Sequence, residues 1–408
     1  MMHRVWSGLA LLAVLIIPPT AQAQMAPEAA AAIQRPVTVE RANTVETIAL
    51  VPHMGKYAIR AGVNGEERSF VFDTGSPTLI SRAFAETLNL KVIGTNTGRD
   101  ANGRAVTTDI ALVERLTIGG LTFTDVPVLI ADFSAADPGR CFFDGGVIGS
   151  EIFPGSVWHF DAEAQELRIA ASLGDIDLED TGPAPFESEL FIGGYPYAPV
   201  FAYSFGSFRD RALFDTGSSD TVTLFERVLG DEQVQKALVS GSMAKGRGSQ
   251  GVSAGGAGAV TDLRRFNLSG FTIGAPFPTL PATTRNAPPT LIGLGMLDRY
   301  DVTLDYPGKR MLLRERSHPA TPKAHPGYAI SMIDGTARVV QLYAGSPAEQ
   351  AGLRLGDEVA AIDGRALTDP AQQCEAMRWL IEDRPADTAR VLSVLRDGEV
   401  VALSLAAQ

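Results

Sequence analysis

The sequence contains one short motif twice, and each copy supplies a carboxyl group. Asp73 begins the run Asp-Thr-Gly-Ser after an apolar segment, and Asp215 begins a second copy after another apolar segment. When two carboxyl groups lie within hydrogen-bond distance, ionising both is unfavourable, so one pKa rises and the pair shares a proton. The ionised member can then take a proton from water while its protonated partner polarises a carbonyl group. The two motifs therefore predict hydrolysis by an activated water molecule.

The residues after each aspartate suit the support of such a pair. We expect the two glycines to allow a sharp turn and to donate backbone N–H groups to the carboxylates. We expect the threonines to hydrogen-bond across the axis between the two copies, and the serines to donate to the outer carboxylate oxygens. A single Asp-Thr-Gly could be an Asx turn at the end of a strand, but that interpretation does not explain the duplication. The six supporting residues are Thr74, Gly75, Ser76, Thr216, Gly217 and Ser218.

The motif belongs to a longer internal repeat. Val147-Ile148-Gly149 follows the first copy, and Leu291-Ile292-Gly293 follows the second at a nearly equal distance. Residues 116–123 and 158–161 also have matching segments downstream, in the same order. Two copies cannot form a solenoid, so they predict two similar lobes related by a pseudo-twofold axis, which would bring the aspartates together.

The elements that must position the motif are mainly strands. Residues 57–63 and 68–72, joined by Asn64-Gly65, predict a hairpin that leads into Asp73. Helices are expected at residues 82–90 and 224–238. Residues 241–258 are rich in glycine, and we expect them to form a mobile loop.

Both halves resemble the aspartic protease clan that contains retropepsins and pepsin, over about residues 45–315. The resemblance implies a mostly β, bilobal fold with a cleft, Asp73 and Asp215 as the catalytic pair, and cleavage of peptide bonds with no covalent intermediate and no cofactor. Pepsin carries a Tyr on the flap over its cleft. The expected flap here, about residues 91–110, contains no Tyr, so pepsin's specificity does not transfer. The glycine-rich segment would supply a second flap.

The C-terminal part resembles a bacterial-type PDZ domain, a small α+β fold. Gly345-Ser346-Pro347-Ala348 and Gly356-Asp357-Glu358-Val359 carry this resemblance. It implies that an extended peptide binds as an added strand, with its terminal carboxylate captured by backbone N–H groups. The capturing loop would comprise Gly327, Tyr328, Ala329 and Ile330.

The amino terminus predicts export. Arg4, the apolar residues 5–17 and the small-residue site Ala21-Gln22-Ala23 are typical of a cleaved signal peptide, and the apolar stretch is too short to span a membrane. We therefore expect a periplasmic or secreted protein with no membrane span after cleavage. The formal net charge of −12 makes nucleic acid an unsuitable partner.

Cysteine and histidine are sparse. The chain has two cysteines, Cys141 and Cys374, and five histidines, and no pair has metal-ligand spacing, so we expect no metal site. A bridge between the cysteines would have to span the linker between two modules. Two separate buried thiols are therefore favoured over a disulfide.

These observations predict an exported aspartic endopeptidase that acts on proteins or peptides, with a PDZ domain for a substrate or for a partner's C-terminal peptide. Two alternatives remain open: a non-catalytic protein that holds peptides in the cleft and the PDZ groove, and an adaptor that recruits a complex through the PDZ domain. The expected segments are a signal peptide (1–23), a spacer (24–44), lobe 1 (45–180), lobe 2 (181–315), a linker (316–325) and a PDZ-like domain (326–408).

Overall fold

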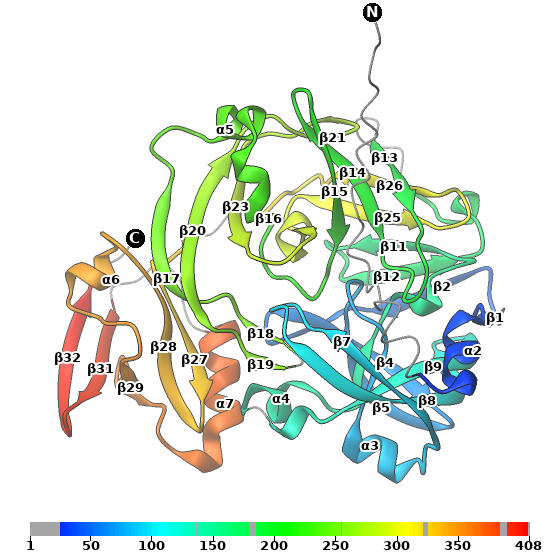
Figure 1. Cartoon of the computed structure of the whole chain (residues 1–408), viewed down its shortest axis with the longest axis horizontal. Helices are drawn as coiled ribbons and strands as arrows, with labels where there is room; N and C mark the ends of the chain where they lie inside the picture. Colours follow the sequence, from blue (N-terminus) through cyan, green and yellow to red (C-terminus); the bar gives the residue numbers. More distant parts are fainter. Residues whose placement is uncertain are drawn as a thin grey trace, which may run out of the picture.

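The structure is a computed structural model that describes residues 25–135, 137–178, 185–253, 255–320, 325–383 and 390–406. The expected signal peptide and part of the expected linker lie outside these residues. Figure 1 shows a molecule built mainly of strands, and the expected mostly β fold is confirmed. No helix in the described ranges is long and apolar enough to cross a membrane.

Lobe 1 is organised around the strand that ends at Asp73. The expected hairpin forms, with Asn64 and Gly65 both at positive φ in the turn. The helix expected at residues 82–90 ends earlier, because Asn89 adopts a positive φ. The elements are α2 (Pro27–Gln34), α3 (Arg82–Thr87), α4 (Asp137–Phe142), β1 (Thr38–Arg41), β3 (Val51–His53), β4 (Lys56–Val63), β5 (Glu66–Phe72), β6 (Leu79–Ser81), β7 (Val92–Arg99), β8 (Ala105–Ile118), β9 (Leu121–Ala131) and β10 (Gly146–Ile148).

Lobe 2 repeats this arrangement around the strand that ends at Asp215. The long helix expected at residues 224–238 is wrong: a strand and a 3-10 turn precede a short helix, which Asp231 caps by accepting from Gln233 N–H. The elements are α5 (Glu232–Ala237), β14 (Val200–Phe205), β15 (Phe208–Phe214), β16 (Val222–Phe225), β17 (Ala244–Ser249), β18 (Val252–Ser253), β19 (Gly256–Ala257), β20 (Val260–Leu268), β21 (Phe271–Ile273), β22 (Ala275–Pro276), β23 (Leu280–Arg285) and β24 (Thr290–Ile292).

The two lobes share the same topology around the motif. β5 runs parallel to β10, so that Phe72 pairs with Ile148. β15 runs parallel to β24, so that Phe214 pairs with Ile292. β6 and β16 lie antiparallel to β10 and β24 respectively. Each aspartate therefore leaves an equivalent buried strand, as the internal repeat predicts.

A six-stranded antiparallel sheet joins the lobes. At its centre His159 pairs with Thr303, and the His159 Nδ1 and Thr303 Oγ1 atoms lie 2.9 Å apart. Above it, the Phe160 and Phe214 rings meet edge to face at 5.5 Å, so both lobes share one apolar core. In spatial order the strands are β2 (Val45–Ala49), β12 (Glu166–Ala170), β11 (Val157–Asp161), β25 (Tyr300–Asp305), β26 (Arg310–Glu315) and β13 (Phe186–Phe191).

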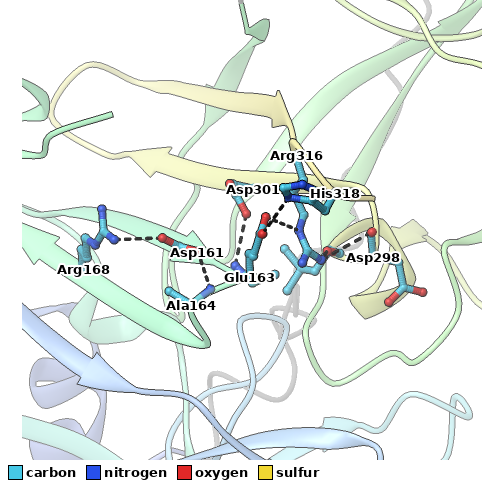
Figure 2. Close-up of polar contacts among 10 residues, drawn as sticks. Asp161, Glu163, Ala164, Arg168, Asp298, Asp301, Arg316 and His318 are labelled. Carbon is cyan, nitrogen blue, oxygen red and sulfur yellow. Dashed lines mark hydrogen bonds and ion pairs between the residues drawn. The ribbon is translucent and has the colours of Figure 1, made fainter. Parts of the chain in front are cut away.

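A polar cluster fastens the end of lobe 2 onto the β11–β12 turn (Figure 2). His318 Nδ1 lies 3.1 Å from Glu163 Oε1, and Arg316 donates to the Leu297 carbonyl oxygen at 2.8 Å. The Asp301 carboxylate accepts from the Ala162 N–H at 3.1 Å, and burial raises the pKa of Asp301. The segment that leads toward the PDZ domain therefore starts from a fixed point beside both lobes.

The PDZ domain continues the lobe 2 sheet and also contacts lobe 1. Its strand β28 pairs with β17, and its helix α7 lies near α4 (Figure 1). Its elements are α6 (Pro347–Gln350), α7 (Gln373–Arg378), β27 (Tyr328–Ile333), β28 (Thr336–Tyr343), β29 (Glu358–Ile362), β30 (Arg365–Ala366), β31 (Arg390–Arg396) and β32 (Glu399–Leu405).

Two sequence-based expectations are wrong at this junction. The glycine-rich segment is not a loop but strand β17 and the hairpin β18–β19. A Cβ on Gly248 would lie 2.2 Å from the Val340 carbonyl oxygen, so the glycines let two backbones approach closely. The cysteines are not separate thiols: Cys141 and Cys374 form a disulfide, with their Cα atoms 5.2 Å apart. The linker does not keep the modules apart, because α7 docks directly on α4.

Candidate active site

The two aspartates face each other at the ends of β5 and β15. Asp73 N–H donates to the Ile148 carbonyl oxygen at 3.0 Å, and Asp215 N–H donates to the Ile292 carbonyl oxygen at 2.9 Å. Each carboxylate accepts a hydrogen bond from the glycine of its own motif, at 2.9 Å from Gly75 N–H to Asp73 and at 2.8 Å in the second copy. The two carboxyl groups are also hydrogen-bonded to each other. The dyad expected from the repeat is thus assembled.

The motif glycines leave just enough space for this contact. A Cβ on Gly75 would lie 2.6 Å from Asp215 Cγ, and a Cβ on Gly217 would lie 2.4 Å from Asp73 Oδ2. A side chain in either place would collide with the opposite carboxylate. The glycines are therefore required by the approach of the two lobes as well as by the turn.

The threonines bind across the axis as expected. Thr74 Oγ1 donates to the Phe214 carbonyl oxygen at 2.5 Å, and Thr216 Oγ1 donates to the Phe72 carbonyl oxygen at 2.7 Å. Each hydroxyl also accepts from the backbone N–H of the other threonine, at 3.0 and 3.1 Å. Both side chains are buried, so these four bonds fix the spacing of the two motifs in a water-free environment.

The serines do not take the role expected from the sequence. The Ser76 hydroxyl donates to the Pro77 carbonyl oxygen at 2.8 Å instead of to the Asp73 carboxylate. The local turn places that peptide oxygen within reach of the hydroxyl, which satisfies it without the dyad. Ser218 lines the cleft, and its N–H donates to the Asp215 carbonyl oxygen at 3.0 Å.

The environment of the dyad favours a shared proton. Burial and the neighbouring Asp215 carboxylate raise the pKa of Asp73 well above its ordinary value. The Gly75 N–H and the Lys56 ammonium act in the opposite direction, but more weakly. The pair can therefore hold one proton at a pH where an isolated aspartate would be ionised, as acid–base catalysis by two carboxyl groups requires.

Sequence reasoning missed two basic residues beside the dyad. Lys56, at the start of β4, lines the cleft and donates to Ser219 Oγ in lobe 2 at 2.5 Å. Burial lowers the pKa of Lys56, although the Asp215, Asp73 and Asp220 carboxylates partly offset this. Arg285, at the end of β23, also lines the cleft. No motif marks either residue: Lys56 begins the hairpin strand before β5, and Arg285 ends β23.

The cleft is covered by two hairpins, as the resemblance implied. The β7–β8 hairpin is the flap of lobe 1, and β17–β20 with the tip β18–β19 is the flap of lobe 2. Their tips are hydrogen-bonded: Asn102 Nδ2 donates to Ser253 Oγ at 2.9 Å, and Ser253 Oγ donates to Asp100 Oδ2 at 2.6 Å. Arg285 adds a bond of 2.9 Å to the Ala101 carbonyl oxygen. The cleft is therefore roofed by residues of both lobes.

The cleft is one cavity of about 960 Å³, and both the dyad and residues of the PDZ domain line it. The expected carboxylate-capturing loop lies on the PDZ side. Gly327 adopts a positive φ, its N–H donates to His325 Nδ1 at 3.0 Å, and its carbonyl oxygen accepts from the Tyr343 N–H. Tyr328 is buried in the PDZ core, Ala329 follows it in β27, and Ile330 lines the cavity. One amide of the loop is thus already engaged within the chain.

Comparison with known proteins agrees with this geometry. Residues 59–152 match the family model described as aspartyl protease, and residues 338–380 match the model of the PDZ domain. The chain therefore combines a domain of the aspartyl protease family with a C-terminal PDZ domain. The first match includes Asp73 and ends before lobe 2, so the assignment of Asp215 depends on the internal repeat and on its contact with Asp73.

Among solved structures, the crystal structure of the aspartic proteinase from Irpex lacteus is similar to this chain. The TM-score is 0.40 at 12% sequence identity, and the match covers 67% of this chain and 98% of the other. No curated protein matches the chain.

Proposed function

We propose that this chain is an exported aspartic endopeptidase, with Asp73 and Asp215 as its catalytic residues. The observation that carries the proposal is the close approach of two half-buried carboxyl groups from equivalent strands, in a cleft roofed by both lobes. Water bound between the carboxyl groups would lose a proton to the ionised one as its oxygen attacks the peptide carbonyl carbon. The protonated carboxyl group would donate to the carbonyl oxygen, giving a neutral tetrahedral diol.

The second half of the reaction uses the same two groups. The carboxyl group that received the water proton would donate it to the leaving nitrogen as the C–N bond breaks. The other carboxylate would take back a proton from the diol as the new carboxyl product forms, which restores the singly protonated pair. No atom of the protein becomes bonded to the substrate, and the dyad ends in its starting state.

The experiment that tests this proposal replaces each aspartate separately. Asp73→Asn and Asp215→Asn should each lower kcat on an unfolded protein substrate by about 10²–10⁴-fold, because each removes an acid–base group. Asp397→Asn is the matched control, since Asp397 is exposed in the β31–β32 turn and adopts a positive φ that Asn tolerates. If both dyad variants keep wild-type turnover, or if the wild type binds peptides and never cuts them, the proposal fails.

Export is proposed from the signal-peptide pattern, and the Cys141–Cys374 disulfide supports it because disulfides persist in oxidising compartments. Cell fractionation with mass spectrometry of the mature chain tests it. A mature amino terminus near Gln24 in the periplasm or medium is expected, whereas a cytoplasmic chain that retains residues 1–23 would contradict it.

A further inference from the structure

The PDZ domain touches both lobes at the same end of the cleft. On the lobe 2 side, Gly246 of β17 pairs with Tyr343 of β28. On the lobe 1 side, Cys374 is bonded to Cys141 of α4, and the Met54 N–H donates to the Glu382 carboxylate. A domain attached only through its linker would make neither contact. The PDZ domain is therefore built into the wall of the cleft.

The same cavity that holds the dyad reaches the face of the PDZ domain between β27 and α7. Ile330 and Ser331 both line it, although consecutive residues of a strand point to opposite faces. The pairing of β27 with β28 shifts register between Ala329 and Ile330, which breaks the regular alternation at this place. The cavity is also lined by Met377, Leu380 and Ile381 at and after α7.

This wall is apolar where it faces the cleft. The Ile381 side chain is 46% exposed, which is unusual for a large aliphatic group beside a polar site. Phe142 and Phe143 of lobe 1 line the same cavity, and their ring centroids are 5.0 Å apart. Lys56 and Arg285 also line it, together with polar PDZ residues such as Ser331 and Gln341. One continuous cavity thus contains both the dyad and an apolar patch of the PDZ domain.

Helix α4 occupies part of the space in which a PDZ domain would hold a separate peptide. It contacts both β27 and α7, and Cys141 and Phe142 pack against the PDZ core. The disulfide keeps α4 there. Ile330, Leu380 and Ile381 still line the cavity that holds the dyad, so a chain that lies in the cleft can contact them.

We propose that the PDZ domain is the third wall of the substrate cleft, and that Ile330, Leu380 and Ile381 bind an apolar side chain of the same extended segment that reaches Asp73 and Asp215. This inference rests on the proposed function, because the occupant is the substrate chain. It assigns the enzyme a preference for segments with a large aliphatic or aromatic residue at a fixed distance from the cleaved bond. A free C-terminal peptide on the PDZ domain is not required.

The test uses the full chain with the Asp215→Asn substitution, so that binding is measured without cleavage. The probes are fluorescent peptides of one length in which a single Leu, or a single Asp as its counterpart, is moved one position at a time. We expect one position, beyond the residues that contact the dyad, at which Leu binds at least tenfold more tightly than Asp. Adding Ile381→Asp should abolish that preference and leave the other positions unchanged.

Val400→Asp is the matched control. Val400 is 65% exposed on β32, at the side of the PDZ domain away from α7 (Figure 1), so it receives the same new charge outside the cleft. Ile381→Ser, a milder change, should lower the preference without adding charge. If both Ile381 variants keep the wild-type Leu preference, or if no position shows one, the third-wall proposal is overturned.

The design separates this inference from the proposed function. If the Ile381-dependent preference is present but the protein with both aspartates never cuts the preferred peptide, the protease proposal fails and the apolar wall stands. If the wild type cuts peptides and Ile381→Asp changes neither binding nor the position of cleavage, the apolar wall fails and the protease proposal stands.

Discussion

The two lobes present the same motif to the cleft but support it differently. In lobe 1 the buried Glu151 carboxylate accepts the Thr78 N–H at 2.9 Å, just behind the turn that carries Asp73. The equivalent place in lobe 2 holds Gly295, where a Cβ would lie 2.4 Å from Thr221 Oγ1. One lobe therefore uses a buried acid and the other uses direct backbone packing. The chemistry requires symmetry at the carboxyl groups, whereas the surrounding support can diverge.

The flaps differ in the same way. In lobe 2 the flap strand β17 pairs with β28, so the PDZ domain braces it. In lobe 1 the flap strand β7 packs against α2, where a Cβ on Gly94 would lie 2.7 Å from the Ala29 Cβ. The PDZ domain reaches lobe 1 through α4 instead. Substrate entry is therefore expected to depend more on movement of the lobe 1 flap than on movement of the lobe 2 flap.

Replacing each motif glycine by alanine is the strongest test of the symmetric arrangement of the two carboxyl groups. Gly75→Ala and Gly217→Ala should each lower kcat by about 10²-fold or more, because each Cβ would displace the opposite carboxylate and misplacement near 1 Å has effects of that size. Gly194→Ala is the control, since nothing lies within 4 Å of its Cβ position. Steady-state kinetics with circular dichroism provide the measurement. Wild-type kcat in one variant only would show that the carboxyl groups do not meet symmetrically.

The arrangement of the two motifs, which both lobes share, is also the feature that the sequence could predict. A repeated Asp-Thr-Gly-Ser run indicates the turn and the carboxylate from residues within the run, and its duplication indicates the threonine contact across the axis. The Ser76 hydroxyl bond could not be predicted, since it depends on the path of the chain at Pro77. Lys56 lies in the hairpin that leads into the first motif, but its contact with Ser219 of lobe 2 depends on the approach of the lobes.

The contacts that each lobe makes with the PDZ domain could mostly not be predicted from the sequence. Glycines in residues 241–258 indicated a loop, yet they permit close pairing with β28, and glycine content alone does not distinguish the two cases. The sequence favours two separate thiols, because nothing in it indicates that the two modules dock on each other. Its two cysteines are 233 residues apart, and only the docking of α7 on α4 brings them together.

Removing the Cys141–Cys374 disulfide should distinguish the two contacts of the PDZ domain, one with α4 of lobe 1 and one with β17 of lobe 2. Cys141→Ser, Cys374→Ser and the double variant should each lower the free energy of unfolding by about 4–5 kcal/mol, because the closed loop is long. The β17–β28 pairing should survive, so the loss should fall mainly on the lobe 1 contact. Denaturant unfolding with and without a reductant measures this. Reductant should shift the wild type and leave the double variant unchanged, and an unshifted wild type would contradict the expectation.

Two buried groups of lobe 1 should make the free energy of unfolding depend on pH in opposite directions. Burial raises the pKa of Glu151 from 4.5 to about 7. Between these values the folded state binds more protons than the unfolded state, so stability is lost as the pH rises through this window, by about 3 kcal/mol. Burial also lowers the pKa of His159 from 6.5 to about 4, which makes stability rise with pH between those values by a similar amount.

The two effects oppose each other and can be separated by isosteric changes. As the pH rises from 4.5 to 7, the free energy of unfolding of Glu151→Gln should increase by about 3 kcal/mol relative to that of the wild type. As the pH rises from 4 to 6.5, the free energy of unfolding of His159→Asn should decrease by a similar amount relative to that of the wild type. The lobe 2 counterparts Gly295 and Thr303 do not titrate in this range. Unfolding free energies over this pH range provide the test. Parallel curves for all three proteins would contradict the assignment of these effects to Glu151 and His159.

The smallest expected effect concerns the contact between the two flap tips. Ser253→Ala removes one donor to Asp100 and one acceptor for Asn102, and each such bond is worth about 1 kcal/mol, or roughly fivefold. If the tips must part for substrate to enter and re-form over it, the change should raise KM a few-fold and leave kcat nearly unchanged. Thr107→Val is the control, because it breaks a 2.9 Å hydroxyl contact with Thr97 on the stem of the same hairpin. A fall in kcat with unchanged KM would contradict this expectation. It would mean that the contact between the flap tips affects the chemical step and not substrate entry.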